Sequence, residues 1–319
     1  MLNIAITGAG PVGLTLARLL LQSSISSSVN ITIYEKDVSR TSRTSLGGTL
    51  DLHSTTGLAA IKEMNVWDEF LKHARFEGEE LRISDLNGTV YIHQTEAPQL
   101  KGFEARPEID RARLMEVLLE SVPDDLIRWG KALTEVIRED DQWQLKFGDG
   151  STAGPFDLIV GADGAWSKVR KALTDVEPSY AGVCGVVGSI DKESAGDSWD
   201  LVSDMVGKGS NFSFSYGQSM MAQRMGDGSL KCAFYARRER GWVDDLKANH
   251  KGDEALKQIL LENYKDWVDD FKQWIVAAKG LWSAPLFELP VGQRFDHKTG
   301  ITLVGDAGKN HFSQHNTRS

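Results

Sequence analysis

The sequence predicts an α/β protein in two parts, a doubly wound parallel sheet and a second unit built on an antiparallel sheet. Three observations carry this prediction. A strand, a glycine turn, a helix and a second strand follow one another within residues 3–35. Two later apolar strands, within 156–164 and 300–307, end in glycine and aspartate. Between them, residues 181–237 form short strands with glycine-rich turns. Apolar runs are typical of buried parallel strands, and short strands with close turns are typical of antiparallel sheets.

The N-terminal stretch has the pattern of a dinucleotide-binding βαβ unit. The strand Asn3–Thr7 leads into Gly8-Ala9-Gly10-Pro11-Val12-Gly13, then a helix, then a strand that ends at Glu35. We expect Gly8 to make a tight turn, Gly10 to let a pyrophosphate approach the backbone, and Gly13 to pack helix on strand. The helix N-terminus favours an anion, and Glu35 can accept hydrogen bonds from ribose hydroxyls. The motif predicts a site for an ADP-ribosyl group but does not separate FAD from NAD(P).

Composition excludes several classes of protein. The 319 residues carry a net charge of −9 and show no basic stripe, which argues against a nucleic-acid partner. Cys184 and Cys232 are too few for a disulfide framework or a zinc site, and we expect both in the core. No apolar run approaches the ~20 residues of a membrane helix. The N-terminus enters the first strand directly, without a leader, so we expect a cytoplasmic protein.

Residues 36–121 contain two further candidate sites. The first is the glycine pair Gly47-Gly48 followed by Asp51. This segment is either part of a ligand site or only a tight turn with a helix-capping acid. A helix is expected to follow from Ser54 to Phe70. Asn87-Gly88 indicates a hairpin within residues 81–92. The second site begins the helix 111–121, for which Asp110 is the expected N-cap. Arg111 and Arg113 are misplaced for the helix dipole, which makes them candidates for binding an anion.

The remaining elements complete both units. A hairpin is expected at 143–147 with its turn at 148–150, and a helix from Ser167 through Leu173 follows Asp163-Gly164. Strands are expected at 183–190, 211–216, 219–223 and 229–237, with a hairpin turn at 225–228. One or two amphipathic helices follow over 253–278, with Trp267 and Trp274 seven residues apart and expected in the core.

Three motifs in this order, the glycine turn at 8–13, Asp163-Gly164 and Gly305-Asp306, resemble the fingerprints of the flavin-dependent aromatic hydroxylases, the para-hydroxybenzoate hydroxylase family. The resemblance spans essentially the whole chain. Within that family, residues 47–53 and 107–111 closely resemble the tetracycline-inactivating monooxygenases and their fungal relatives.

This resemblance implies FAD and NADPH as cofactors, and an aromatic or polycyclic small molecule and O2 as substrates of a monomeric enzyme. NADPH would reduce FAD, and O2 would serve to hydroxylate an electron-rich ring. Because the flavin carries the chemistry, no catalytic side chain or metal is expected. Arg43 would contact NADPH, and Asp163-Gly164 would bind both cofactors. The cofactor-binding residues that the resemblance implies are Gly8, Gly10, Pro11, Val12, Gly13, Glu35, Lys36, Arg43, Asp51, Arg111, Asp163, Gly164, Gly305 and Asp306.

The resemblance also implies domain boundaries. The FAD-binding domain would comprise residues 1–76, 102–176 and 286–308, and the substrate domain residues 77–101 and 177–285. Residues 309–319 are polar and are expected to form a disordered tail.

Two departures from the family leave alternatives open. After Ala307 the family continues with Ala-His, a proline, a Gly-x-Gly turn and a helix, which this sequence lacks. We therefore expect a C-terminally truncated form that holds FAD poorly, and a non-catalytic remnant is one alternative. An FAD-dependent oxidase or dehydrogenase is another. Val186-Val187-Gly188 is apolar where the tetracycline-inactivating enzymes place polar substrate contacts, which argues against that drug as substrate.

Overall fold

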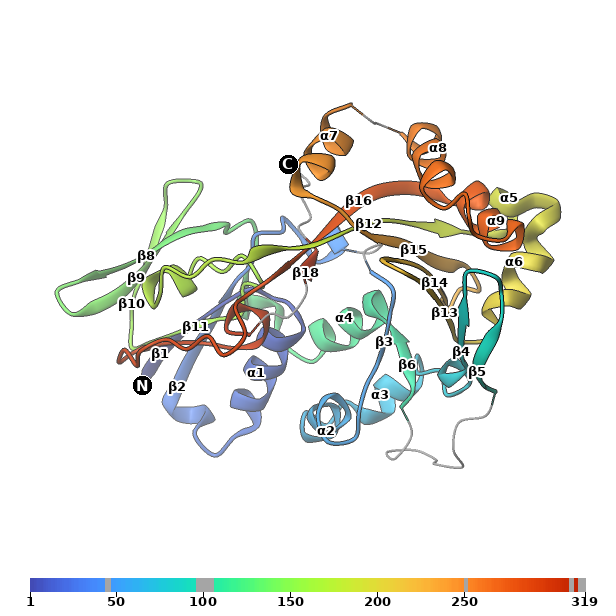
Figure 1. Ribbon diagram of the computed structural model, residues 1–319. Helices are drawn as coiled ribbons and strands as arrows, with labels where there is room; N and C mark the ends of the chain where they lie inside the picture. The colour runs from blue at the N-terminus through green and yellow to red at the C-terminus, as the bar shows by residue number, and fades with distance from the viewer. Residues whose placement is uncertain (44–46, 96–105, 250–251, 310–312, 315–319) are drawn as a thin grey trace.

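A computed structural model describes residues 1–43, 47–95, 106–249, 252–309 and 313–314. It confirms the predicted mixed α/β class. Figure 1 shows a parallel sheet near the N-terminus and a large, mostly antiparallel sheet, with α4 (Arg111–Glu120) between them. Within these residues no helix has the length and apolar character that a bilayer span requires.

The parallel sheet has the strand order β17-β11-β1-β2-β7. Its centre is β1, which pairs in parallel with β11 on one side and with β2 on the other. Ile4, Ile6 and Ile33 are buried on the face covered by α1 and α4. This arrangement brings the carboxyl ends of β1, β11 and β17 to one edge. The bounds of these elements are β1 Leu2–Thr7, α1 Pro11–Gln22, β2 Val29–Tyr34, β7 Ile127–Arg128, β11 Leu158–Gly161 and β17 Ile301–Leu303.

A three-stranded sheet covers the opposite face of the parallel sheet. Its strands are β8 (Leu133–Glu139), β9 (Gln142–Phe147) and β10 (Thr152–Phe156). Trp143, Leu145 and Phe147 alternate along β9 and pack with Ala5 and Ile159 of the parallel sheet. The predicted hairpin at 143–150 is confirmed, but β8 was not predicted. Its side chains are mostly exposed, so its sequence gives no apolar alternation to detect.

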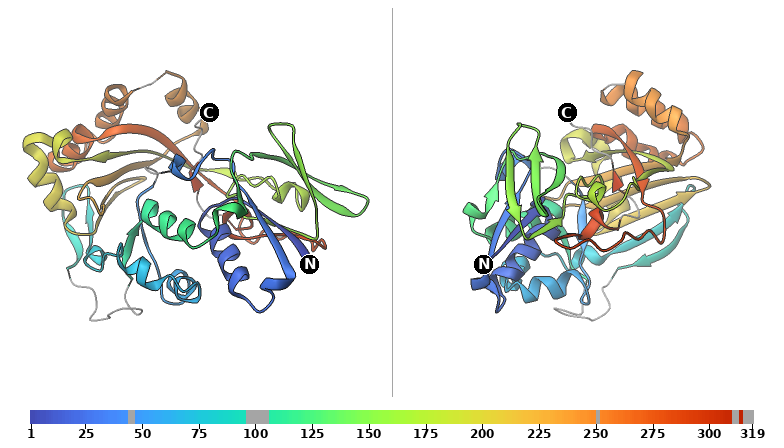
Figure 2. Two further views of the ribbon diagram at one scale, coloured as in Figure 1. Left: turned by 180° about the vertical axis from the view of Figure 1, so that it is seen from behind. Right: turned by 90° about the vertical axis from the view of Figure 1, so that its left-hand side faces the viewer.

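The large sheet has the order β18-β16-β12-β15-β14-β13-β4-β5. Side chains of one face join the helices α6 to α9 in a single apolar core that includes Trp267, Trp274, Cys232 and Phe234. Figure 1 and the left view of Figure 2 show α7 and α8 on the opposite side of this sheet from α4. The bounds are β4 Leu81–Asp85, β5 Val90–Gln94, β12 Ser179–Ile190, α5 Lys192–Ala195, α6 Trp199–Val206, β13 Ser210–Ser215, β14 Gln218–Arg224, β15 Leu230–Arg237, α7 Arg240–Asn249, α8 Asp253–Asn263, α9 Asp269–Ala277, β16 Lys279–Glu288 and β18 Ser313–Gln314.

Most predictions for this sheet are confirmed, including the hairpin turns at Asn87-Gly88 and 225–228 and the burial of Cys184 and Cys232. Two need correction. The sheet is not purely antiparallel, because β13 and β4 pair in parallel. Within the predicted tail, Ser313 and Gln314 form a short strand paired with β16, and residues 310–312 and 315–319 lie outside the described part of the chain.

The predicted helix from Ser54 to Phe70 is two helices, α2 (Gly57–Glu63) and α3 (Trp67–Leu71). Asn65 adopts a left-handed conformation with φ of 56°. The N–H of Asn65 donates to the carbonyl of Lys62, and that of Val66 donates to the carbonyl of Ile61. These two bonds satisfy the end of α2 and stop it. Ser54 and Thr55 lie before the N-cap position, which Thr56 occupies.

The predicted helix at 167–173 is only a 3₁₀ turn, Arg170–Ala172. Its backbone bonds from Ala172 N–H to the carbonyl of Val169 and from Leu173 N–H to that of Arg170 each span three residues, as in a 3₁₀ helix. The Asp163 carboxylate accepts hydrogen bonds from the N–H groups of Lys168 and Val169, and Ser167 Oγ accepts one from Arg170 N–H. These three N–H groups lie at the start of the turn and would have no backbone partner in a longer helix either, so the side chains cap the turn.

A cluster of buried charges joins the strand β6 (Glu108–Asp110) to the large sheet. Arg75 Nη2 lies 3.5 Å from Glu108 Oε2, 3.3 Å from Asp110 Oδ1 and 2.9 Å from the carbonyl oxygen of Arg224. The Asp110 carboxylate also accepts from Gly226 N–H at 3.0 Å. Asp110 therefore occupies the N-cap position of α4, as predicted, but its side chain binds the other sheet rather than capping the helix.

We predict that Arg75→Met lowers the free energy of unfolding by about 2–4 kcal/mol, because it leaves two largely buried carboxylates without their cation. The matched control is Arg113→Met, which removes an exposed pair with Glu116 and should cost less than about 1 kcal/mol. Urea unfolding of both variants measures the difference. Equal, small effects would show that the cluster does not hold β6 to the sheet.

Candidate functional site

The first and last glycines of the turn after β1 each lie close against the backbone of another residue. Gly8 has φ of 102°, and a Cβ there would lie 2.4 Å from the carbonyl oxygen of Ala162. A Cβ on Gly13 would lie 2.1 Å from the carbonyl oxygen of Gly8. Gly10 differs, because a Cβ there would meet no atom within 4 Å. Gly8 and Gly13 are therefore required by packing, as predicted, whereas Gly10 leaves open space beside the first turn of α1.

The end of β2 places a carboxylate beside this turn. Glu35 is 2% exposed, and its Oε2 accepts a hydrogen bond of 2.6 Å from Ala9 N–H while Oε1 accepts one of 3.0 Å from Asp37 N–H. A charged acceptor strengthens such bonds. The Glu35 carboxylate, which is predicted to accept hydrogen bonds from a ribose, therefore also holds the glycine turn to the end of β2.

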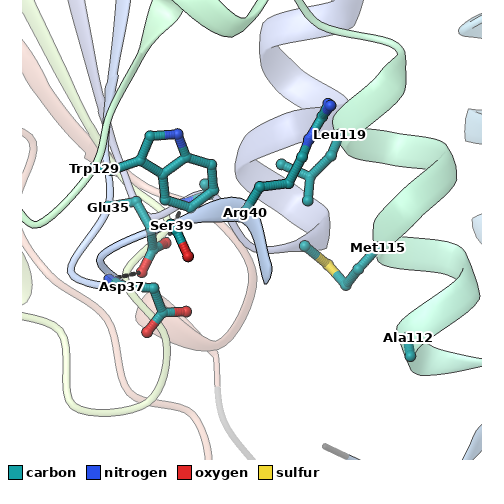
Figure 3. Close-up of a pocket in the computed structure, with 9 residues that line it drawn as sticks. Glu35, Asp37, Ser39, Arg40, Ala112, Met115, Leu119 and Trp129 are labelled. Atoms are coloured by element: carbon teal, nitrogen blue, oxygen red, sulfur yellow. Dashed lines mark hydrogen bonds between the residues drawn. The ribbon is translucent and has the colours of Figure 1, made fainter. Parts of the chain in front are cut away.

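A small pocket opens next to Glu35. Figure 3 shows Trp129, Glu35 and Asp37 on one side, three side chains of α4 on the other, and Arg40 between them. The lining residues are Ala9, Glu35, Asp37, Ser39, Arg40, Ala112, Met115, Leu119 and Trp129. An aromatic ring facing apolar helix side chains, with a carboxylate and a helix N-terminus adjacent, suits a heteroaromatic base attached to a ribose phosphate.

The second motif, Asp163-Gly164, follows β11 at the same edge of the sheet. Burial raises the pKa of the Asp163 carboxyl group, while hydrogen bonds from Ser167 and from the Lys168 N–H oppose the rise. Its Oδ1 atom is buried and has no hydrogen-bond partner in the described part of the chain. A buried acceptor without a partner is costly, so this atom is suited to a donor from a ligand or from water.

Arg170 ties this turn to the third motif. It is 2% exposed, and its guanidinium donates to the carbonyl oxygens of Ala165 at 2.7 Å, Val176 at 3.2 Å and Ala307 at 3.0 Å. Loss of hydration lowers the pKa of Arg170, and the Asp163 carboxylate opposes that change. One buried cation thus fixes the spacing between Asp163-Gly164 and the turn Gly305–Ala307.

The third motif, Gly305-Asp306, lies directly against the first. Gly305 has φ of 60°, and a Cβ on it would lie 2.9 Å from Val12 Cγ2. Asp306 interacts electrostatically with Arg111 at the start of α4. Burial lowers the pKa of Arg111 and raises that of Asp306, and each charge opposes the shift of the other. Both residues nevertheless keep access to solvent, so they line the site rather than the core.

Arg111 also reaches the glycine pair. A Cβ on Gly47, whose φ is 102°, would lie 2.4 Å from Arg111 Cδ, and Arg111 N–H donates to the carbonyl oxygen of Gly48. In the described residues the Arg111 guanidinium makes no hydrogen bond or ion pair, in contrast to Arg113, which pairs with Glu116. Of the two arginines proposed to bind an anion, only Arg111 is placed to do so.

The other predicted residues are peripheral. Pro11 and Val12 are exposed in the first turn of α1, Lys36 is exposed after β2, and Asp51 is exposed at the end of β3 (Thr49–Asp51), 3.3 Å from His53. Arg43 ends a 3₁₀ turn, and its side chain lies outside what the structure describes.

The sequence reasoning missed Arg40, Trp129, Arg170 and Gln223 as site residues. Trp129 and Arg40 reach the pocket from two segments far apart in the chain, so no local spacing joins them. Arg170 follows Asp163-Gly164 by only six residues. Its position among apolar residues could have indicated a buried cation, which needs several hydrogen-bond acceptors. A side-chain oxygen of Gln223, on β14, would lie 2.7 Å from a Cβ on Gly48, in the loop before β3.

The face of the large sheet that is turned away from α6–α9 carries an apolar row. Successive members are register partners in neighbouring strands, and all are half-buried. None belongs to, or packs against, the apolar clusters formed by the described residues. The row consists of Trp282, Val187, Ala233, Met221, Phe212 and Ile83.

These features fit the FAD that the sequence resemblance implies. Gly10 and the N-terminus of α1 suit a pyrophosphate, the pocket beside Glu35 suits an adenosine, and Arg111 supplies a cation that faces the carboxylate of Asp306. The individual residue assignments remain proposals that rest on this geometry.

Comparison with known proteins agrees with this fit. Residues 1–193 match the family model described as FAD binding domain. Monooxygenase asqM of Emericella nidulans is 33% identical over 358 residues, covering 96% of this chain and 77% of the relative. The structure of 2,6-dihydroxypyridine-3-hydroxylase from Arthrobacter nicotinovorans superposes with a TM-score of 0.77 at 18% identity, covering 97% and 77% of the two chains. That of tetracycline destructase Tet(51) gives 0.65 at 16% identity, covering 97% and 75%.

We predict that Gly10→Val weakens FAD binding by roughly tenfold or more, equivalent to about 1.4 kcal/mol, because its side chain fills the space beside the helix N-terminus. As a change at an N-cap it should cost the fold only about 1 kcal/mol. Gly13→Val should instead destabilise the fold, since its Cβ would meet the Gly8 carbonyl. FAD titration and urea unfolding of both variants separate the effects, and unchanged FAD affinity in Gly10→Val would contradict the assignment.

Proposed function

Because the chain belongs to the family of flavoproteins that carry this FAD-binding domain, we propose that it is a monooxygenase that uses FAD and NADPH to hydroxylate an aromatic or polycyclic small molecule. The apolar row on the large sheet is the observation that carries the substrate class. Half-buried apolar side chains that stabilise no core are available to a planar apolar ligand.

The row is long enough for an extended ring system. Its six strands span five inter-strand spacings, or roughly 24 Å. The small side chains of Val187 and Ala233 lie in the middle, Trp282 lies at one side, and Met221 and Phe212 lie at the other. Val186 points into the helix-covered core, so within the apolar run 186–188 it is Val187 that faces a ligand.

Bound FAD would supply the activation of O2, and the protein would supply position and exclusion of water. The residues proposed to hold the cofactor do so from three strand ends, through backbone N–H groups of α1, the Glu35 carboxylate and the Arg111 guanidinium. Arg170 joins the ends of β11 and β17 at the same edge of the sheet by its contacts with the carbonyl oxygens of Ala165 and Ala307. The apolar row would hold the ring and leave water little to bind there.

NADPH as reductant is part of this proposal. It is supported by the resemblance of Asp163-Gly164 to a motif that binds both cofactors, and by the unpartnered Oδ1 atom of Asp163. The contact from Arg43, the division into FAD-binding and substrate domains, and a monomeric, cytoplasmic enzyme are proposed on the sequence alone.

We expect the purified, FAD-loaded protein to oxidise NADPH faster with some members of a panel of phenols, anthraquinones and tetracycline than without them. Under ¹⁸O2 the product should carry one labelled oxygen atom, which mass spectrometry detects. Hydrogen peroxide formed in equal amount with every compound, and no labelled product, would indicate an oxidase. A protein that binds no FAD even when FAD is added would indicate the non-catalytic remnant instead.

A further inference from the structure

Gln223 lies where the apolar row meets the glycine pair of the cofactor site. It follows Met221 on the same face of β14, and its register partners are Ser210 on β13 and Lys231 on β15. A Cβ on Gly48 would lie 2.7 Å from Gln223 Oε1. Because Arg111 packs on the adjacent Gly47, the glycine pair has Arg111 on one side and Gln223 on the other.

A hydrogen bond from its nitrogen atom orients the carboxamide group of Gln223. Gln223 Nε2 donates to Ser210 Oγ at 3.4 Å, and Ser210 Oγ donates to Glu108 Oε1 at 3.5 Å. Burial raises the pKa of Glu108, while the hydroxyl of Thr49 and the Arg75 cation oppose the rise. This chain of contacts connects Gln223 to the buried charges that join the two sheets, and it directs the amide oxygen toward the glycine pair.

An apolar row alone does not orient a ligand, because burial of apolar surface has no preferred direction. A binding site discriminates between related ligands through a polar group of the protein. A ligand that cannot hydrogen-bond to this group leaves it without a partner and therefore binds more weakly. On this face Gln223 offers a half-buried amide oxygen, and Lys231 is the neighbouring cation. Of these two side chains, Gln223 is the one found beside the cofactor-site glycines.

We propose, on the basis of the proposed monooxygenase function, that Gln223 is a specificity-determining residue. Its amide oxygen accepts a hydrogen bond from a hydroxyl or N–H group on the ring of a substrate that lies along the apolar row. The substrate class is therefore a planar aromatic compound with a ring hydroxyl or ring N–H, held with that substituent beside Gly48.

The experiment compares 2-naphthol, which can donate a hydrogen bond, with 2-methoxynaphthalene, which cannot. Calorimetric titration of the FAD-loaded wild-type protein should give about tenfold tighter binding of 2-naphthol, the upper range for one neutral hydrogen bond. Gln223→Leu should reduce that ratio to near one, and Gln223→Asn should leave an intermediate ratio. FAD absorbance should be unchanged in both variants. The matched control Gln142→Leu, at an exposed position on β9, should keep the wild-type ratio.

The outcomes separate the two proposals. If wild type binds both compounds equally, or if both FAD-loaded Gln223 variants keep the tenfold ratio, the inference is wrong while the proposed function stands. If Gln223→Leu alone keeps the tenfold ratio, the inference is also wrong, whatever the effect of Lys231→Met. If the FAD-loaded protein binds neither these compounds nor any aromatic compound of the panel, the proposed function fails, and the inference fails with it.

Discussion

The close approach of Gly13 to the Gly8 carbonyl is the contact on which the site depends. No side chain fits between them, because a Cβ on Gly13 would lie 2.1 Å from that oxygen. The contact sets the N-terminus of α1 directly above the carboxyl end of β1. Parallel pairing then places the ends of β11 and β17 beside it, so the three short motifs meet although they are far apart in the chain. Arg170 fixes the second and third motifs relative to each other by donating to carbonyl oxygens of both turns.

The two faces of the large sheet have different roles: one stabilises the fold, and the other is proposed to bind a ligand. One face is fully used by the helices α6–α9, where large aromatic side chains such as Trp274 and Phe271 are buried edge to face. The other face keeps an apolar row that contributes to no core. Polar contacts of Arg75, Glu108 and Asp110 join the strand β6 to the large sheet, and Trp166 packs edge to face on Phe287 of β16 elsewhere. A polar junction leaves the apolar surface beside it for a ligand.

The local sequence pattern predicted those parts of the fold in which neighbouring residues determine the backbone geometry and the burial of side chains. The glycine turn, the hairpin at Asn87-Gly88 and the apolar strands were of this kind. The local pattern was less reliable at the ends of helices. The stretch 167–173 forms only the 3₁₀ turn Arg170–Ala172, and the left-handed Asn65 ended α2 within an otherwise periodic stretch. Asp110 was placed correctly at the N-cap, but its carboxylate was drawn to Gly226 in another sheet.

The sequence by itself determined the fold class, the nucleotide-binding turn and the family, because these follow from spacings of a few residues around strand ends. Only the tertiary structure decided which of Arg111 and Arg113 faces the site, that Trp129 and Arg40 share a pocket with Glu35, and that Gln223 lies beside Gly48. It also decided that Val187 rather than Val186 lies on the free face. Contacts of this kind join residues that are tens to hundreds of positions apart, and which of them form depends on strand order and register, which no local pattern specifies.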